Sequence, residues 1–393
     1  MAHPPVPSPL TRALAAAIAL AAAVATVSCD RSAGSPPDTY AGVSVRQRSP
    51  DAISDTTVEF AQHPSLAIVS GMVPWNLLEP QDDAFDWTQL DANVADARDR
   101  DRRIILRIMA GRLSPQWLTA AGMASIEILG TDPNAFDFCQ LIQVPLPWDP
   151  VLEAEYRELL AAVAEWMEEP DGDGGTKGDH VLAVPISMPS VLGSEMQIGF
   201  GQDLACPAGT EGAGLNLAGT NRERWTAVGS VADLRAWTEE AWRAAIAIHL
   251  DELPDEIPSV IAYGGIFGDS LSAAVHLAET EVPPETDRLW SMFTNLQPAV
   301  SANGTTEGPW ADWCPVCDQI LTGVRDVGGV VGLQLAATEG VDEADELMYA
   351  IDEAVPRYEP RFLEVNPEIA AAFEGYLLTD PDSVQERIRD ATG

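Results

Sequence analysis

Apolar runs alternate with amphipathic stretches along the chain from about residue 60 onward. The runs are apolar almost throughout, which is typical of parallel strands that are buried on both faces. The stretches between them repeat apolar residues every three or four positions, which predicts helices with one buried face. Eight strands are predicted in this way, at residues 66–73, 103–110, 141–146, 181–188, 259–267, 289–296, 329–336 and 361–366.

This alternation predicts the α/β class and a single (β/α)₈ TIM barrel with long βα loops. In such a barrel the residues that act on a ligand lie on the loops that follow the strands, at the C-terminal face. Candidate chemistry is therefore expected directly after each predicted strand.

The N-terminal 29 residues have a different composition. Residues 13–28 are apolar or small, follow a single Arg at position 12, and are too few for a spanning helix, which needs about 20 apolar residues. A basic start followed by a short apolar run is typical of a secretory signal peptide. The sequence Thr-Val-Ser-Cys that ends at Cys29 resembles the lipobox of bacterial lipoproteins, although Thr26 stands where that motif prefers an aliphatic residue. The resemblance implies a lipid anchor on Cys29, and ordinary signal cleavage is the alternative.

Three segments are expected: a lipoprotein-type signal peptide at 1–29, a flexible tether at 30–58 and a barrel domain at 59–393. The tether is predicted because that segment is rich in Ser, Pro, Asp and Gly. The protein is expected to be exported and to contact a membrane only through its N-terminal lipid, either in the periplasm or at the cell surface.

The charge is strongly negative, with 61 acidic residues against 22 basic ones and a net charge of −39. Such a surface repels nucleic acid and anionic lipid, so nucleic acid is not expected as a partner. High salt screens the self-repulsion, so the composition also suits a salt-rich environment.

Four cysteines follow Cys29, and an even number in an exported chain suggests two disulfides. Of the three possible pairings we favour Cys139–Cys206 together with Cys314–Cys317. The alternative for the Cys-Pro-Val-Cys segment is a redox pair or half of a zinc site, but neither a second such motif nor a nearby His supports it. No metal and no cofactor is expected.

Two motifs follow the first two predicted strands. Pro-Trp-Asn-Leu-Leu-Glu-Pro occupies 74–80 and is followed by Phe-Asp-Trp at 85–87, while Ser-Pro-Gln-Trp-Leu occupies 114–118. In this order they resemble the start of the barrel glycosidases of β-galactosidase family 42 and its clan, over about residues 66–118. The resemblance implies a retaining glycoside hydrolase that acts on an oligo- or polysaccharide, with an acid/base glutamate after strand 4 and a nucleophilic glutamate after strand 7.

Retaining hydrolysis needs one protonated carboxyl to release the leaving oxygen and one ionised carboxyl to attack the anomeric carbon. Glu195 is the acid/base candidate, with Ser194 in place of the Asn that the family motif carries. Glu339 is the nucleophile candidate and Glu364 is its alternative. If Gln334 occupies the nucleophile position instead, the protein is a non-catalytic glycan-binding lipoprotein on a degenerate glycosidase barrel.

The chain has 11 Trp, and an exposed Trp face can stack on the apolar face of a sugar. The alternative is that the loop Trp residues simply cover the barrel mouth. Arg107 could bond a substrate hydroxyl or hold a catalytic carboxylate ionised, or it could be a plain ion-pair partner. Asp149 could accept from a sugar hydroxyl, but we favour a cap on the next helix. The candidate substrate-binding residues are Trp75, Asn76, Arg107, Trp117, Trp148 and Trp310.

Overall fold

The computed structural model describes a set of ranges that all lie in one compact unit, Thr39–Gly393. These ranges are 42–46, 63–131, 137–188, 196–198, 200–201, 203–266, 288–296, 315–326, 328–335, 344–365 and 374–392.

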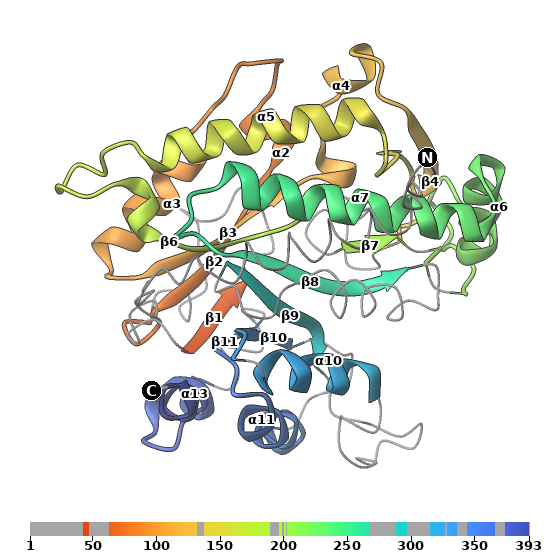
Figure 1. Ribbon diagram of the computed structural model, residues 1–393. Helices are drawn as coiled ribbons and strands as arrows, with labels where there is room; N and C mark the ends of the chain where they lie inside the picture. Colours follow the sequence, from red (N-terminus) through yellow and green to blue (C-terminus); the bar gives the residue numbers. More distant parts are fainter. Residues whose placement is uncertain are drawn as a thin grey trace, which may run out of the picture. The chain divides into compact units, whose positions relative to one another are not determined.

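Eight parallel strands form a closed ring, which confirms the predicted TIM barrel (Figure 1). The order of pairing is β6-β3-β2-β1-β11-β10-β9-β8, and the ring closes where Val184 and Pro185 of β6 pair with Ser259 and Val260 of β8. The strands are β1 (Gly42–Arg46), β2 (Ile68–Pro74), β3 (Arg103–Met109), β6 (Val181–Pro185), β8 (Ser259–Ile266), β9 (Leu289–Leu296), β10 (Val331–Leu335) and β11 (Phe362–Val365).

Two members of the ring differ from the predicted set. Strand β1 lies inside the segment predicted to be a tether, so that prediction is wrong for Gly42–Arg46; it is a five-residue strand defined by its partners β11 and β2. The predicted strand at 141–146 is β5 (Leu141–Pro145), which pairs antiparallel with β4 (Ser125–Leu129) outside the ring. An apolar run does not reveal which strand it will pair with. One predicted strand lies outside the ring and one strand of the ring was not predicted, so the predicted number of eight is still correct.

The helices connect these strands as the periodicity predicts. Helix α5 begins after Asp149, whose side chain accepts from the backbone N–H groups of Val151 and Leu152, which confirms Asp149 as a helix cap. No helix within the described ranges is both long and apolar enough to cross a membrane. The helices are α2 (Trp75–Leu78), α3 (Thr88–Asp99), α4 (Trp117–Ala120), α5 (Pro150–Met167), α6 (Leu217–Val228), α7 (Val231–Glu252), α10 (Pro315–Asp326), α11 (Ala344–Tyr358) and α13 (Val384–Thr392), with short helical turns at Gly111–Leu113, Lys177–His180 and Gly375–Thr379.

Two apolar cores result from the alternation of side chains along each strand. The larger core lies between the strands and the helices, where α5 and α7 run side by side (Figure 1). The smaller core forms a separate cluster to which alternate residues of the barrel strands contribute, so it fills the barrel interior. This inner cluster includes Ile68, Ile105, Leu182, Val260, Trp290 and Phe362.

A buried hydrogen-bond chain links the helical layer to the barrel. His249 on α7 lies 2.8 Å from the hydroxyl of Tyr156 on α5 and 3.1 Å from the hydroxyl of Ser259 at the start of β8. Burial lowers the pKa of His249 to about 3, so the ring is neutral at ordinary pH.

Candidate functional site

A polar layer lies next to the apolar interior of the barrel, on the side of its C-terminal ends. Each of its residues stands two positions after an interior residue on the same strand, so each points into the barrel one layer further along. The layer consists of Ser70, Arg107, Gln334 and Glu364, which come from β2, β3, β10 and β11.

An ion pair between Arg107 and Glu364 is at the centre of this layer. The Arg107 Nη2 atom donates to both carboxylate oxygens of Glu364, at 3.0 and 2.8 Å, and both side chains are fully buried. Arg107 Nε donates to the Ser70 hydroxyl at 3.0 Å. The Gln334 amide also donates to Glu364. A buried charge is tolerated when it is paired and hydrogen-bonded, and this pair meets both conditions.

The ion pair changes the interpretation of three predicted residues. Glu364 has no exposed surface, and its carboxylate accepts hydrogen bonds from Arg107 and Gln334, so it balances the charge of Arg107. Its alternative role as the nucleophile stays a prediction. Arg107 forms an ion pair with Glu364, which was one of the two roles that the sequence allowed for it. Gln334 occupies an inward position near the end of β10, where its amide supplies a hydrogen bond that a carboxylate could not donate.

The loops after β2 and β3 are joined through Glu79, a residue that the sequence analysis did not single out. Trp75 Nε1 donates to the Glu79 carboxylate at 2.8 Å, and Trp117 Nε1 donates to the Glu79 backbone carbonyl at 3.0 Å. The backbone N–H of Asp83 also donates to the carboxylate, at 3.1 Å. Burial outweighs these hydrogen bonds and raises the pKa of Glu79. The Trp-to-Glu spacing of four residues within the motif is the signal that could have pointed to this contact.

The predicted sugar-binding tryptophans differ in their surroundings. Trp75 is fully buried in the outer core against Tyr156, so it packs the protein interior and does not line a cleft. Trp148 is half-buried and packs against Trp225 and Trp237, with ring centroids 6.2 and 5.2 Å apart. Trp117 is also half-buried and packs against the larger core, and its indole N–H donates to Glu79.

Asn76 stays a candidate ligand residue. It lies in α2, two positions after the end of β2, and is half-buried, and its Oδ1 atom has no hydrogen-bond partner among the residues the structure describes. A buried acceptor without a partner is unfavourable, so a donor supplied by a ligand would stabilise it.

Several predicted residues lie outside the described residues. These are Cys29, Glu195, Trp310, Cys314 and Glu339, together with the side chain of Cys317. Glu195 directly precedes β7 (Met196–Ile198), which pairs with β8 at Met196↔Tyr263 and Ile198↔Ile266. Because β6 pairs with the first part of β8, β7 continues the fourth barrel position after a break in the strand.

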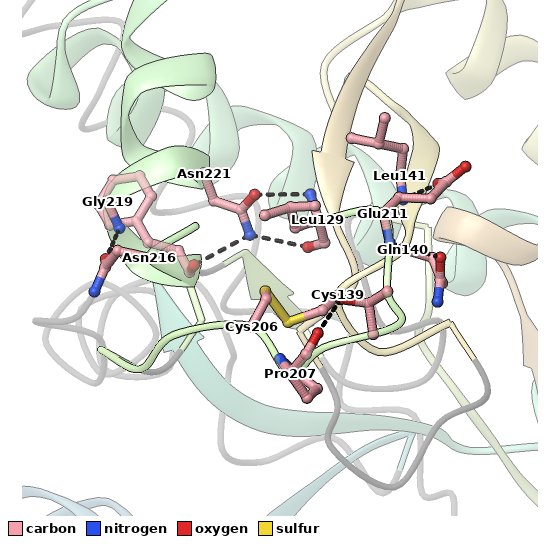
Figure 2. The surroundings of a disulfide bond; sticks show 12 residues. Leu129, Cys139, Gln140, Leu141, Cys206, Pro207, Glu211, Asn216, Gly219 and Asn221 are labelled. Carbon is pink, nitrogen blue, oxygen red and sulfur yellow. Dashed lines mark hydrogen bonds between the residues drawn. A yellow bond between two sulfur atoms is a disulfide. The ribbon is translucent and has the colours of Figure 1, made fainter. Parts of the chain in front are cut away.

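The predicted disulfide Cys139–Cys206 is confirmed (Figure 2). It joins the loop after β3 to the loop after β7. Around it lie β4, β5, residues 203–216 and α6, which we call the disulfide lobe. The backbone N–H of Gly212 donates to the Cys139 carbonyl at 3.0 Å, and the N–H of Leu141 donates to Glu211 at 2.8 Å. The lobe is therefore a folded unit built from two βα loops.

A metal centre finds no support in the described part of the chain. No group of three or more His, Cys, Asp or Glu side chains lies close enough there to hold an ion.

Comparison with known proteins agrees with the barrel. The family model for beta-galactosidases of glycoside hydrolase family 42 matches residues 46–132, which run from the end of β1 past β4. No curated protein sequence matches the chain.

Solved structures resemble the chain in fold, each at low sequence identity. A beta-galactosidase from the psychrophile Marinomonas ef1 aligns with a TM-score of 0.50 and 11% identity, over 89% of this chain and 59% of that one. A cold-adapted beta-galactosidase from Rahnella sp. R3 aligns with a TM-score of 0.49 and 11% identity, over 83% and 50%. An intracellular xylanase from Thermoanaerobacterium saccharolyticum aligns with a TM-score of 0.45 and 11% identity, over 85% and 89%. The chain thus spans between half and three-fifths of the two beta-galactosidase structures. The family match supports a glycosidase, and the likeness to the Marinomonas structure supports the barrel fold.

Proposed function

We propose that the protein is an exported retaining glycoside hydrolase that acts on β-linked sugars. The observation that carries this proposal is the family match over residues 46–132, because it covers both motifs, and these follow adjacent strands of a parallel barrel. A β-galactoside is the first substrate to test, since the matching family is described as beta-galactosidase.

Glu195 is the proposed acid/base and Glu339 the proposed nucleophile. Glu195 follows the fourth barrel strand in the chain, and Glu339 comes four positions after the last residue of β10, the seventh strand. The ion pair of Glu364 with Arg107 favours Glu339 over Glu364. Retention requires two carboxyl groups about 5–5.5 Å apart, one protonated and one ionised.

The test compares turnover of aryl β-galactosides and β-xylosides by the wild-type chain with that of Glu195→Gln and Glu339→Gln. Loss of a general acid or base lowers kcat by about 10²–10⁴-fold, and loss of the nucleophile lowers it by at least as much. Glu223→Gln is the matched control, because Glu223 is an exposed carboxylate on α6. Unchanged turnover in Glu195→Gln would remove Glu195 from the mechanism.

A non-catalytic glycan-binding protein is the second candidate. The observation that favours it is the pair Gln334 and Glu364, since an amide holds the inward position near the end of β10 and the neighbouring carboxylate is neutralised by Arg107. Binding of oligosaccharides by calorimetry, with no turnover of any aryl glycoside by the wild-type chain, would establish this alternative.

Export and lipid attachment at Cys29 form part of the proposal. Disulfides persist in oxidising compartments, so the buried Cys139–Cys206 bond supports export. Mass spectrometry of the membrane fraction should find a diacylated N-terminal cysteine, and Cys29→Ala should release the protein from that fraction. An unmodified wild-type chain would contradict the anchor.

A further inference from the structure

One buried side chain connects the segment after β7 to the disulfide lobe through hydrogen bonds. Asn221, on α6, has no exposed surface. Its amide nitrogen donates to the backbone carbonyls of Leu129 and Phe200, at 2.9 and 3.1 Å. Its Oδ1 accepts from the Leu129 N–H at 2.8 Å (Figure 2). One side chain thus joins the end of β4 to a residue two positions beyond β7.

The disulfide is a second link between the segment after β7 and the loop after β3. Cys206 lies six positions after Phe200 and is bonded to Cys139, which belongs to the loop after β3. Both cysteines are buried, and they pack with Leu129 and Leu217. The two links therefore hold Phe200 and Cys206 against the same loop.

Strand β7 is short. It contains three residues and pairs with β8. A short edge strand with one described partner opens easily. Its position at the barrel mouth therefore depends on the segment that follows it, and that segment belongs to the disulfide lobe.

We propose that Asn221 and the Cys139–Cys206 disulfide are positioning elements that hold β7, the strand that directly follows Glu195 in the chain. The role of Glu195 rests on the proposed function. In this proposal Asn221 and the disulfide act through the backbone of β7 and not on the reacting atoms. A catalytic group displaced by about 1 Å can lose about 10²-fold in rate, so a small movement of this strand is sufficient.

The experiment uses the full chain with two independent changes, Asn221→Leu and the double substitution Cys139→Ser/Cys206→Ser. Glu223→Gln, on the exposed side of the same helix, is the control. Backbone hydrogen exchange reports on residues 196–200, and exchange in β2 and β3 reports whether the barrel is intact. On an aryl glycoside, kcat, KM and the pH profile of kcat/KM are measured for each protein.

Both changes are expected to speed exchange of residues 196–200 by about tenfold or more and to leave β2 and β3 protected. We expect kcat to fall by about 10–100-fold with a smaller change in KM, and the alkaline limb of the pH profile to shift, because the acid/base group has moved.

Unchanged exchange at residues 196–200 in both variants overturns the proposal, whether or not the protein is an enzyme. Faster exchange with unchanged kcat also overturns it, since β7 would then not position a catalytic group, while the proposed function would stand. If the wild-type chain shows no turnover, the proposed function fails, and the exchange measurement alone decides whether the lobe holds β7.

Discussion

Replacing Glu364 with Gln removes a buried negative charge while nearly preserving the shape of the side chain. Arg107 Nη2 donates to both oxygens of the wild-type carboxylate, at 3.0 and 2.8 Å. The new amide carries its NH₂ group at one of these two positions, so a donor faces the donor of Arg107 in either orientation. The charge of Arg107, whose side chain is fully buried, is then left without its partner.

The expected loss of stability is large for one substitution. Breaking a buried ion pair from one side costs about 3–5 kcal/mol, because the remaining charge stays out of water. We therefore expect Glu364→Gln to lower the free energy of unfolding by about this amount. Adding Arg107→Met removes the orphaned charge, so the double variant should lose less than the sum of the single losses, by up to about 3 kcal/mol.

Equilibrium unfolding in urea, followed by Trp fluorescence and circular dichroism, measures the stability of Glu364→Gln, of Arg107→Met and of the double variant. Glu386→Gln is the control. Glu386 pairs with Arg389 at 2.7 Å, but both side chains are more than one-third exposed. An exposed pair contributes at most about 1 kcal/mol, so this variant should unfold almost as the wild-type chain does.

A loss below about 1 kcal/mol in Glu364→Gln, together with additive effects in the double variant, would refute the ion-pair reasoning. A stable Glu364→Gln variant with abolished turnover would instead return Glu364 to the position of nucleophile.

Three further predictions follow from single contacts. Gly332→Ala places a methyl group against the ring of Phe362, so overpacking should cost about 1–3 kcal/mol in a urea titration, and an unchanged midpoint would contradict it. The pKa of His249 is about 3 in the folded state against about 6.5 in the unfolded state, so between these pH values only the unfolded state is protonated. The free energy of unfolding should therefore fall as the pH drops below about 6.5, by up to about 1.4 kcal/mol per pH unit. His249→Gln should flatten that slope, and an equal slope in the variant would exclude His249 as its cause. Gln385→Ala removes a 2.7 Å hydrogen bond from α13 to the Ser65 carbonyl and should cost about 1 kcal/mol in thermal unfolding, whereas an unchanged midpoint would show that water replaces the bond.

Local features of the chain were sufficient for much of the architecture. The length and spacing of the apolar runs predicted the barrel, because buried parallel strands must be apolar on both faces. For Asp149 the helix cap was the favoured of two interpretations, and it could be reached from the local sequence because a cap contacts backbone groups two and three residues away. The Cys139–Cys206 pairing was one of only three possible sets, so a simple count narrowed it strongly.

Only the tertiary structure decided the features that depend on distant partners. Strand β1 is too short to stand out in the sequence and is defined by β11, which lies more than 300 positions away. Arg107 and Glu364 are 257 positions apart, and neither the charge nor the spacing of one predicts the other. Trp75 looked like a loop residue but packs inward against Tyr156, and its indole N–H donates to Glu79, one helical turn later. A local sequence pattern predicts which face of a strand or helix is buried. Which other strand or helix packs against that face is determined only when the whole barrel closes.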